Sequence, residues 1–492
     1  MSKNQSNFRQ ALWLGISQAS TFVVVFLSGA ILSRYFPKCD YGTYKQVMFV
    51  YTTLNVIFTA GLVSVFPFFI PRYSKEEGKT IVNKVTFMLL LLGGVFSVFL
   101  FLTSGLIANL LNNPDLEGAL KYFCLAPLFT LPALGVEGLY TALRKTQYVV
   151  IYQVGGKLFL FLCCILPVLL WNGTYKEAII GWVFASFLSF LMALVMKGLP
   201  YRHIKAKPVD KLYKQVFDYS LPLMSASLVG LAFHSANQFF ISRYCGQSVF
   251  AEYSNGYLAL PIVPMIAGSI KSVLVPLFSK ASKEGNMNDA IKSYESSLIK
   301  CVTLVFPFIF FCFLFSQDIM SLAFGKSYAS SGSYFRCSLI NDMFACLPYL
   351  AIILALGGTK AYFRAHLYVA IAIWAIDFIL VVCHITDPIL FAIIFTVLSG
   401  FTSVYMFLYI KNKLNIVLLT KRLKRRLLKI IFYLLIITIV IAFIHHLCSP
   451  FVNPYINLCI CGLLFFTIVS LSGQIINEDF YLGSVKRLFH EP

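Results

Sequence analysis

The stretch Ser33-Arg34-Tyr35 recurs 209 residues later as Ser242-Arg243-Tyr244. Four further residues repeat at the same offset without a gap: Tyr44 as Tyr253, Ile57 as Ile266, Pro67 as Pro276 and Phe69 as Phe278. A second repeated stretch, with an offset of 216, pairs Leu131-Pro132 with Leu347-Pro348 and Tyr152 with Tyr368. The chain is therefore predicted to contain two copies of one unit.

Both copies of the repeat are strongly apolar. Hydrophobic residues make up 59% of the 492 residues, charged residues only 12%, and the mean hydropathy is +0.80. A soluble domain does not have this composition. At about 20 residues per span, we predict an all-α polytopic membrane protein of about fourteen transmembrane helices. Their predicted starts are residues 10, 45, 85, 119, 148, 177, 218, 252, 293, 334, 364, 388, 427 and 454.

The repeat and the helix count together predict the domain organisation. Residues 1–198 form a first lobe of six helices, residues 199–217 a cytoplasmic linker, and residues 218–411 a second lobe of six helices. A basic cytoplasmic loop at 412–426 precedes a final helix pair and a short cytoplasmic tail within 427–492. Because six is an even number, the two lobes have the same topology, as in transporters built from parallel repeats around a cavity.

The positive charges predict the orientation. Most of the 40 Lys and Arg residues fall in the N-terminus, the even-numbered loops and the C-terminus. The positive-inside rule then places both termini in the cytoplasm. The net charge of +20 follows from this bias and requires no nucleic-acid partner. We expect the cationic run at 421–426 to set the topology and to contact anionic lipid headgroups. Since both lobes lie in one polypeptide, we expect a monomer.

Short loops and missing motifs argue against an enzyme. No loop is long enough to bury a core of its own. The sequence lacks the Walker A, GxGxxG, HExxH and GxSxG motifs. The 13 Cys are scattered without a CxxC, which favours small buried side chains over metal or redox chemistry. We expect no enzymatic activity, no cofactor, and transport driven by a gradient.

Five ionisable residues fall inside predicted spans: Glu137, Lys157, His234, Lys271 and Asp377. A charge near the bilayer centre costs about 2.5–3.5 kcal/mol on insertion scales, so such residues usually face a cavity or a partner. One Lys in each half suits a substrate with phosphate or pyrophosphate, because Lys binds phosphate as a point charge. Glu137, Asp377 and His234 are the candidates for proton or sodium coupling. The structural alternative is an internal ion pair, such as Glu137 with Lys157.

Further polar residues are candidates for substrate binding. Arg34 and Arg243 are repeat equivalents just past the outer end of each lobe's first helix, where they could bind headgroup phosphates or line an outer gate. The alternative is that both side chains snorkel to the interface. The amides of Gln18, Asn55 and Asn237 suit sugar hydroxyls, but such amides also hold helices together.

Prolines at matching positions predict bends in both lobes. We expect helices to be interrupted at the pairs Pro132/Pro348 and Pro67/Pro276, and also at Pro222, Pro261 and Pro264. The carbonyls that proline leaves without a donor create bends and hinge points. Bends at equivalent places suit alternating access by rocking lobes, although static packing can use the same bends.

The residues Leu32-Ser33-Arg34-Tyr35 and Tyr41-Gly42-Thr43-Tyr44 resemble the first-loop signature of the polysaccharide transporter family. These are the O-antigen and capsule flippases of the multidrug/oligosaccharidyl-lipid/polysaccharide (MOP) superfamily. Tyr253-Ser254 and Pro276-Leu277-Phe278-Ser279 resemble the second-lobe stretches of that family. Span count, loop lengths and duplication extend the resemblance over nearly the whole chain.

The resemblance has implications for fold and function. It implies a MATE-like V shape of two six-helix bundles plus two C-terminal helices. It also implies a flippase that moves an undecaprenyl-pyrophosphate-linked oligosaccharide to the outer leaflet of the bacterial plasma membrane. The product would feed surface polysaccharide synthesis, alongside polymerase or assembly proteins.

Two sister branches of the superfamily match less well. Cation-exporting multidrug proteins typically have a carboxylate in the first helix and lipid II flippases an Arg, whereas the helix here reads Gly15-Ile16-Ser17-Gln18-Ala19-Ser20. Both remain alternatives. A drug/cation antiporter predicts that Glu137 and Asp377 dominate the cavity, whereas the oligosaccharide flippase predicts that Lys157 and Lys271 face a common cavity. A third hypothesis, a membrane enzyme of polysaccharide assembly, needs a catalytic site for which the short loops leave no room.

Overall fold

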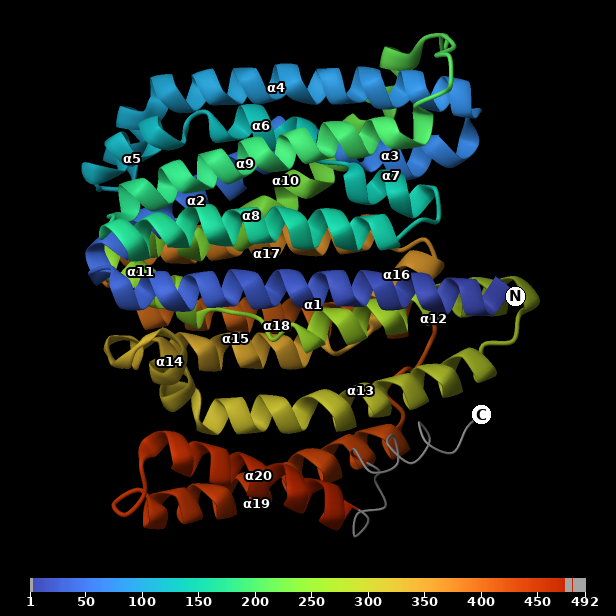
Figure 1. Cartoon of the computed structure of the whole chain (residues 1–492). Helices are drawn as coiled ribbons and strands as arrows, with labels where there is room; N and C mark the ends of the chain where they lie inside the picture. The colour runs from blue at the N-terminus through green and yellow to red at the C-terminus, as the bar shows by residue number, and fades with distance from the viewer. Residues whose placement is uncertain (1–2, 474–479, 481–492) are drawn as a thin grey trace. The chain divides into compact units, whose positions relative to one another are not determined.

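The computed structural model describes residues 3–473 and residue 480 (Figure 1). Every regular element in this part of the chain is a helix, and no strand occurs in it. Within the described residues, eleven helices are long and apolar enough to cross a membrane, and counting three bent helix pairs as single spans raises the number to 14. The predicted all-α polytopic fold is therefore confirmed.

Contacts divide the chain into two compact units. Of the described residues, the first unit contains 3–254 and 377–388, and the second contains 255–376, 389–473 and 480. The helices of the first unit are α1 (Lys3–Tyr35), α2 (Lys38–Phe58), η1 (Leu62–Ser64), α3 (Val65–Phe69), η2 (Ile70–Arg72), α4 (Lys75–Leu110), α5 (Asp115–Phe123), α6 (Ala126–Ala133), α7 (Val136–Ala142), α8 (Gln147–Trp171), α9 (Tyr175–Gly198), η3 (Leu199–Tyr201), α10 (Leu212–Tyr244) and most of α11 (Gln247–Gly256).

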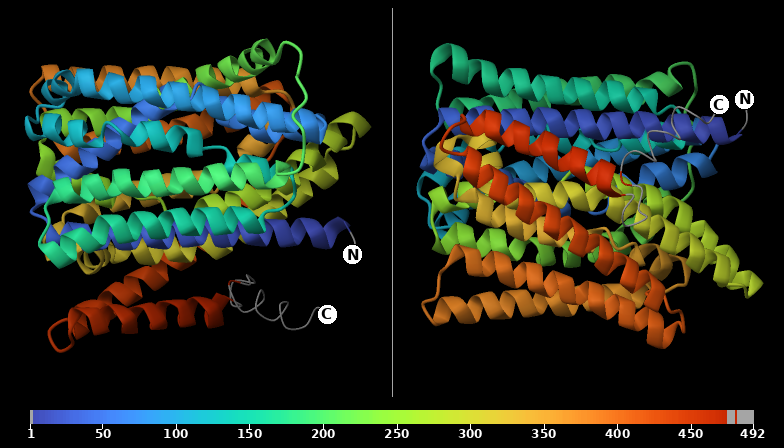
Figure 2. Two further views of the ribbon diagram at one scale, coloured as in Figure 1. Left: turned by 45° about the horizontal axis from the view of Figure 1, so that its top comes forward. Right: turned by 90° about the horizontal axis from the view of Figure 1, so that it is seen from below.

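The second unit contains α12 (Ile262–Glu284), α13 (Asn288–Leu314), α14 (Ser316–Phe324), η4 (Lys326–Tyr328), α15 (Ser331–Ala345), α16 (Tyr349–Ala355), most of α17 (Thr359–Val382), α18 (Pro388–Lys413), α19 (Lys421–Cys448) and α20 (Pro454–Ser472). In this unit α19 and α20 pack against each other as a hairpin, coloured red in Figure 2, and α13 contacts both of them.

Two helices begin inside segments that the sequence predicted to be a linker or a loop. Helix α10 begins at Leu212, inside the predicted linker at 199–217, and α19 begins at Lys421, inside the predicted loop at 412–426. The cationic run at 421–426 therefore forms the first turns of α19. The physical reason is the cap: Thr420 Oγ1 accepts a hydrogen bond of 3.2 Å from the Leu423 N–H.

The non-helical part of the linker is held on α4. Thr80 Oγ1 donates to the carbonyl of Lys207 at 2.6 Å, and Lys79 Nζ donates to the carbonyl of Ile204 at 2.7 Å. At the start of α4, Ser74 and Glu77 form a capping box. Two carbonyl groups of the linker thus accept hydrogen bonds from side chains at the start of α4, so the linker is fixed to this helix.

Close helix packing in the first unit depends on small residues. Helices α8 and α9 pack along each other, and α8 also packs against α1 (Figure 1). A Cβ added at Gly181 of α9 would lie 2.0 Å from the Cys163 carbonyl oxygen of α8. Inside a bilayer, where lipid is as apolar as the helix surface, such close approach is a main source of helix association.

Three spans are bent, and one of the bends coincides with a predicted proline, Pro348. The bends are 60° between α2 and the short helices at Leu62–Arg72, 48° between α5 and Ala126–Ala142, and 43° between α15 and α16. Pro132 lies in the last turn of α6, just before a break, and Pro348 is the N-cap of α16, so both interrupt their spans.

Two other proline predictions are wrong. Pro222 lies inside α10 and Pro276 inside α12, and both helices continue through them. A proline removes one helical hydrogen bond, and in a bundle the freed carbonyl can be satisfied without breaking the helix.

A network of buried hydrogen bonds includes Ser242, one of the repeated residues. Asn113 Nδ2 donates to Gln46 Oε1 at 2.6 Å and to Thr43 Oγ1 at 3.0 Å. Gln46 Nε2 in turn donates to Ser242 Oγ at 2.8 Å. This hydrogen-bond network connects α2, the α4–α5 loop and the end of α10, so the repeated Ser242 has a packing role in this unit.

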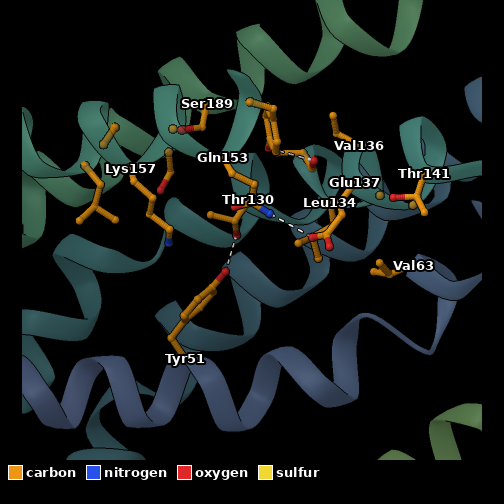
Figure 3. A pocket seen from close by; sticks show the side chains of 18 of the residues that line it. Tyr51, Val63, Thr130, Leu134, Val136, Glu137, Thr141, Gln153, Lys157 and Ser189 are labelled. Carbon is orange, nitrogen blue, oxygen red and sulfur yellow. Dashed lines mark hydrogen bonds between the residues drawn. The ribbon is translucent and has the colours of Figure 1, made fainter. Parts of the chain in front are cut away.

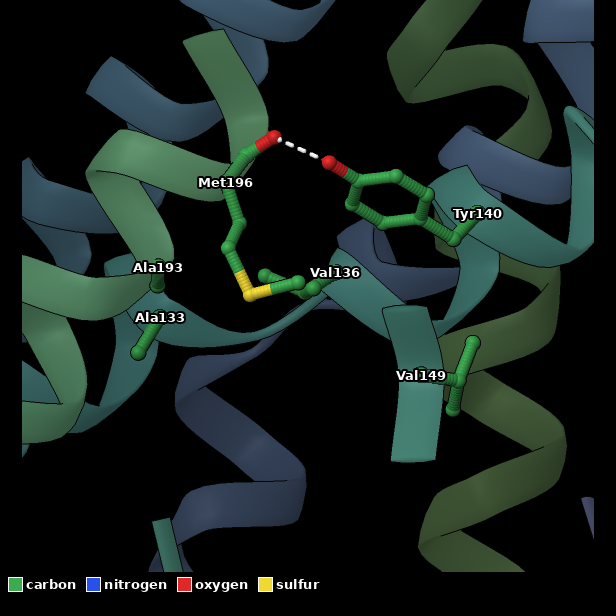
Figure 4. Close-up of a cluster of buried hydrophobic side chains, with 6 residues drawn as sticks. All are labelled: Ala133, Val136, Tyr140, Val149, Ala193 and Met196. Atoms are coloured by element: carbon green, nitrogen blue, oxygen red, sulfur yellow. Dashed lines mark hydrogen bonds between the residues drawn. The ribbon is translucent and has the colours of Figure 1, made fainter. Parts of the chain in front are cut away.

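An apolar cluster supports one end of α9. Its buried residues are Ala133, Val136, Tyr140, Val149, Ala193 and Met196 (Figure 4). The hydroxyl of Tyr140 donates to the Met196 carbonyl at 2.8 Å. In a continuous helix that carbonyl would accept from residue 200, but Pro200 has no N–H. Tyr140 therefore replaces a helical hydrogen bond that the sequence of α9 cannot make.

We predict that Tyr140→Phe lowers the free energy of unfolding by about 1 kcal/mol, because it leaves the Met196 carbonyl without a donor. The measurement is thermal or denaturant unfolding of the purified protein in detergent. Tyr148→Phe is the matched control, since the Tyr148 ring stacks on Tyr140 at 5.0 Å without this bond. Equal stability of the Tyr140→Phe and wild-type proteins would contradict the assigned role.

Candidate functional site

A cavity of about 620 Å³ lies within the first unit, among α2, α6, α7, α8, α9 and the short helices after α2 (Figure 3). This volume is in the range of small-molecule sites. Its lining includes aromatic, amide, hydroxyl and charged side chains, among them Tyr51, Ser64, Thr130, Glu137, Thr141, Tyr152, Gln153, Lys157, Trp182, Ser186 and Ser189.

Two bent spans form one wall of the cavity. The break between α6 and α7 contributes the backbone at 133–137, and the bent end of the α2 span contributes Ser64 and Pro67. Gly135 has φ of +88°, a conformation that favours glycine. A Cβ there would lie 2.2 Å from the Phe66 ring, and one at Gly138 would lie 2.8 Å from Pro67 Cδ. The two breaks therefore pack directly against each other.

Lys157 supplies a positive charge near the middle of α8, a helix of 25 residues. Its half-buried side chain reaches into the cavity, across from Tyr51 (Figure 3). Among the described residues, no carboxylate lies within ion-pair distance of its Nζ. An amine held at this depth without a fixed counter-ion is available to an anionic ligand.

Glu137 lines the same cavity but does not pair with Lys157. Instead Gln153 Nε2 donates to Glu137 Oε2 at 3.1 Å, as Figure 3 shows. The Glu137–Lys157 ion pair, which was the alternative to a role of these residues in substrate binding, is therefore absent. Gln153 lies one turn before Lys157 on the same face of α8. Of these two residues, Gln153 is the one within hydrogen-bond distance of the Glu137 carboxylate on α7.

Aromatic and hydroxyl groups complete the lining. Tyr51 donates to Thr130 Oγ1 at 2.9 Å, and its ring meets the Trp182 ring edge-on at 5.3 Å. Tyr152 donates to the Ala133 carbonyl at 3.1 Å, which ties α8 to the break. Aromatic faces, amides, hydroxyls and the Lys157 amine form a surface suited to an anionic group together with a polyhydroxyl group.

The sequence matches the family model described as "Polysaccharide biosynthesis protein" over residues 8–282, more than half of the chain. The chain belongs to this polysaccharide biosynthesis protein family. No curated protein matches the sequence.

Solved structures show the fold of this family member. It is similar to the lipid II flippase MurJ in an inward closed conformation, with a TM-score of 0.70, 15% identity, and coverage of 95% of this chain and 100% of that one. An inward-facing multidrug resistance MATE family transporter of the MOP superfamily gives a TM-score of 0.63 at 12% identity, covering 84% of this chain and 99% of that one. A MOP superfamily transporter from Pyrococcus furiosus gives 0.59 at 13% identity, covering 83% and 95%.

The family match identifies a polysaccharide biosynthesis protein, and the structural matches show that its multi-pass helical fold is the one seen in MurJ and in MATE transporters. The predicted resemblance to a polysaccharide family is confirmed. At these identities the structural matches establish the fold and leave the substrate open.

Several predicted site residues lie outside the cavity of this polysaccharide biosynthesis family member. Gln18 is exposed on α1, and Arg34 is exposed in the last turn of α1. Asn55 is half-buried on α2, and its Oδ1 has no hydrogen-bond partner among the described residues. The guanidinium of Arg243 donates to the Leu110 carbonyl at the end of α4, where a cation stabilises a helix C-terminus.

The other predicted residues include two buried groups. Asp377 on α17 is 0% exposed and Asn237 on α10 is 1% exposed. In the described part of the chain, neither Asp377 oxygen has a hydrogen-bond partner, and the same is true of the Asn237 amide. Lys271 is exposed on α12, and His234 is exposed on α10 with its ring against Phe233. Of the ten candidates, Glu137 and Lys157 line the cavity of the first unit.

Residues that the sequence did not single out also belong to this site. Gln153 orients Glu137, while Tyr51 and Trp182 form the aromatic side of the cavity. The spacing of Gln153 and Lys157 by one helical turn was a readable signal. Tyr51 and Trp182 gave none, because aromatic residues are abundant throughout the chain.

Proposed function

We propose that this protein is a flippase that carries an undecaprenyl-pyrophosphate-linked oligosaccharide from the cytoplasmic to the outer leaflet of the bacterial plasma membrane. The product would be used for surface polysaccharide synthesis. The observation that supports this most is Lys157, a membrane-embedded amine that lines a cavity and has no carboxylate partner among the described residues. Family membership provides the independent support for a polysaccharide precursor.

The cavity offers a separate place for each part of such a substrate. Lys157 would hold the pyrophosphate by a charge-assisted hydrogen bond that can also be released. The Glu137–Gln153 pair would accept and donate hydrogen bonds to sugar hydroxyls, and Tyr51 and Trp182 would pack against sugar rings. Lys271, exposed on α12 of the second unit, stays a candidate phosphate ligand by its charge alone.

Asp377 is the residue we propose for coupling. It is fully buried, and neither carboxylate oxygen has a hydrogen-bond partner in the described part of the chain. Such a carboxylate is costly in its charged form unless a proton or a cation neutralises it. Asp377 would therefore carry the coupling proton or sodium ion, outside the cavity that holds Lys157. Anionic lipids would contact the exposed cations at the start of α19.

The test is reconstitution of the full-length protein in vesicles that contain a polyprenyl-pyrophosphate oligosaccharide with a fluorescent glycan. Translocation is measured as loss of accessibility to a membrane-impermeant glycosidase or quencher. We expect translocation of the fluorescent glycan lipid only in vesicles that contain the protein. A polyprenyl phosphate without a glycan should inhibit this translocation only weakly. Transport of a lipophilic cation instead of the glycan lipid would contradict the proposal.

The Glu137 carboxylate in the cavity favours one second candidate, a drug/cation antiporter. We predict that Glu137→Gln lowers glycan-lipid translocation by only about tenfold, the loss of one hydrogen bond to a charged group. An antiporter would lose cation transport completely, because the carboxylate would be its cation ligand. The measurement compares glycan-lipid translocation with efflux of a cationic dye. Glu117→Gln serves as the control, because this partly exposed carboxylate of α5 lies outside the cavity lining.

A further inference from the structure

Lys197 lies at the end of the first predicted lobe, next to the basic linker, yet the structure buries its side chain. It lies in the last turn of α9 and is 4% exposed. Its Nζ donates to the Leu134 carbonyl at 2.6 Å, to the Pro132 carbonyl at 2.8 Å and to Thr86 Oγ1 at 3.2 Å. No carboxylate in the described part of the chain pairs with it.

The two carbonyls belong to the break between α6 and α7. In a continuous helix they would accept from the N–H groups four residues later, but α6 ends at Ala133 and α7 begins only at Val136. The end of α6 also has the partial negative charge of a helix C-terminus, which favours a cation. Lys197 thus replaces the donors that the break removes and compensates the charge of the helix end.

The same amine contacts the second bent span. Lys197 Nζ lies 4.8 Å from the centre of the Phe66 ring, and Phe66 belongs to α3. That ring is the group that a Cβ at Gly135 would strike. Phe66 is therefore held between Lys197 and Gly135, so one side chain of α9 fixes both bent spans.

The position of Glu137 depends on this arrangement. Glu137 follows Gly135 by two residues, and it lines the cavity together with the backbone at 133–136. Tyr152 fixes the opposite side of the break through the Ala133 carbonyl. A change in the break would move the cavity wall and Glu137 relative to Lys157, which belongs to another helix.

We propose that Lys197 is a positioning residue for transport, which holds the α6–α7 break and Phe66 in the arrangement that forms the cavity wall and does not itself contact the substrate. The transport part of this inference rests on the proposed flippase function. The geometric part concerns the cavity wall alone and is testable whatever the substrate is.

The test uses the full-length chain with Lys197→Arg, Lys197→Gln and Lys197→Met. The matched control is Lys176→Met, which removes an exposed cation from the same helix. The first readout is translocation of the glycan lipid in vesicles. The second is the rate at which a charged, water-soluble maleimide modifies Glu137→Cys in each background, after subtraction of the parent chain with its 13 native Cys.

We expect Lys197→Met to lower translocation and to change the Glu137→Cys labelling rate, each by about tenfold, comparable to the loss of one hydrogen bond to a charged group. Lys197→Arg should restore both readouts to within about threefold, because it keeps donors and charge. If Lys197→Met does not fold, Lys197→Gln decides in its place, since its amide keeps donors without charge and should fall between the two.

An unchanged labelling rate in Lys197→Met or Lys197→Gln, with or without a loss of transport, overturns the inference. The same holds if Lys197→Arg behaves like Lys197→Met, because a positioning role requires rescue by the conservative variant. If wild-type protein moves no glycan lipid but the labelling rates change as expected, the proposed function fails and the role of Lys197 in the cavity wall stands.

Discussion

Lys157→Met is expected to reduce glycan-lipid translocation by at least about a hundredfold, because a Lys–phosphate hydrogen bond in a desolvated site contributes about 3 kcal/mol. The side chain lines the first-unit cavity, and no described carboxylate neutralises it. Met retains the length and apolar stem of Lys, so the variant removes the charge and leaves the packing of α8 almost unchanged. Lys157→Arg should keep a measurable part of the activity, since it retains the charge with a different donor geometry.

The measurement is the initial rate of translocation in vesicles, normalised to the amount of folded protein. Lys176→Met provides the control, because it removes one exposed cation from the same unit away from the cavity. If Lys157→Met transports at the wild-type rate, Lys157 is not a phosphate ligand, and the proposed substrate then rests on family membership alone. Equal losses in both lysine variants would indicate a general charge effect.

Gly135→Val is expected to lower the free energy of unfolding by more than about 3 kcal/mol and to abolish transport. The backbone at Gly135 has φ of +88°, which β-branched residues rarely adopt. The new Cβ would also lie 2.2 Å from the Phe66 ring. The ring cannot easily move away, because Lys197 lies on it and holds the adjacent break.

The measurement is the thermal unfolding midpoint in detergent, together with the yield of folded protein. Gly118→Ala is the control, since a Cβ added at this position inside helix α5 would meet no heavy atom within 4 Å. That variant should be neutral or more stable by up to about 1 kcal/mol, through the higher helix propensity of Ala. Stability of Gly135→Val equal to wild type would show that the two bent spans are not tightly joined.

The site was only partly predictable from sequence because its residues differ in how local their signals are. Lys157 and Glu137 stood out as charges in apolar segments, and the structure places both in one cavity. The alternative, an ion pair between them, does not form, because the Glu137 carboxylate accepts a hydrogen bond from Gln153 instead. Asn237 and Asp377 also stood out, but the structure buries both and places neither in the lining of this cavity.

Lys197 is the clearest case of a residue whose role could not be predicted from the sequence. At the end of an apolar span, a Lys indicates topology, and nothing in the neighbouring sequence distinguishes it from the exposed Lys205 or Lys207. Its role appears only when α9 packs beside the α6–α7 break and its amine reaches the Pro132 and Leu134 carbonyls.

The sequence by itself determined the helical class, the presence of many membrane-spanning segments and the breaks at Pro132 and Pro348, because these depend on hydropathy, segment length and backbone chemistry within one stretch of chain. The tertiary structure alone decided which charges share a cavity, which hydrogen-bond partner each one takes, and which lysine holds the cavity wall. Those outcomes depend on helix packing between segments that are distant in sequence, where a shift of one turn exchanges one hydrogen-bond partner for another.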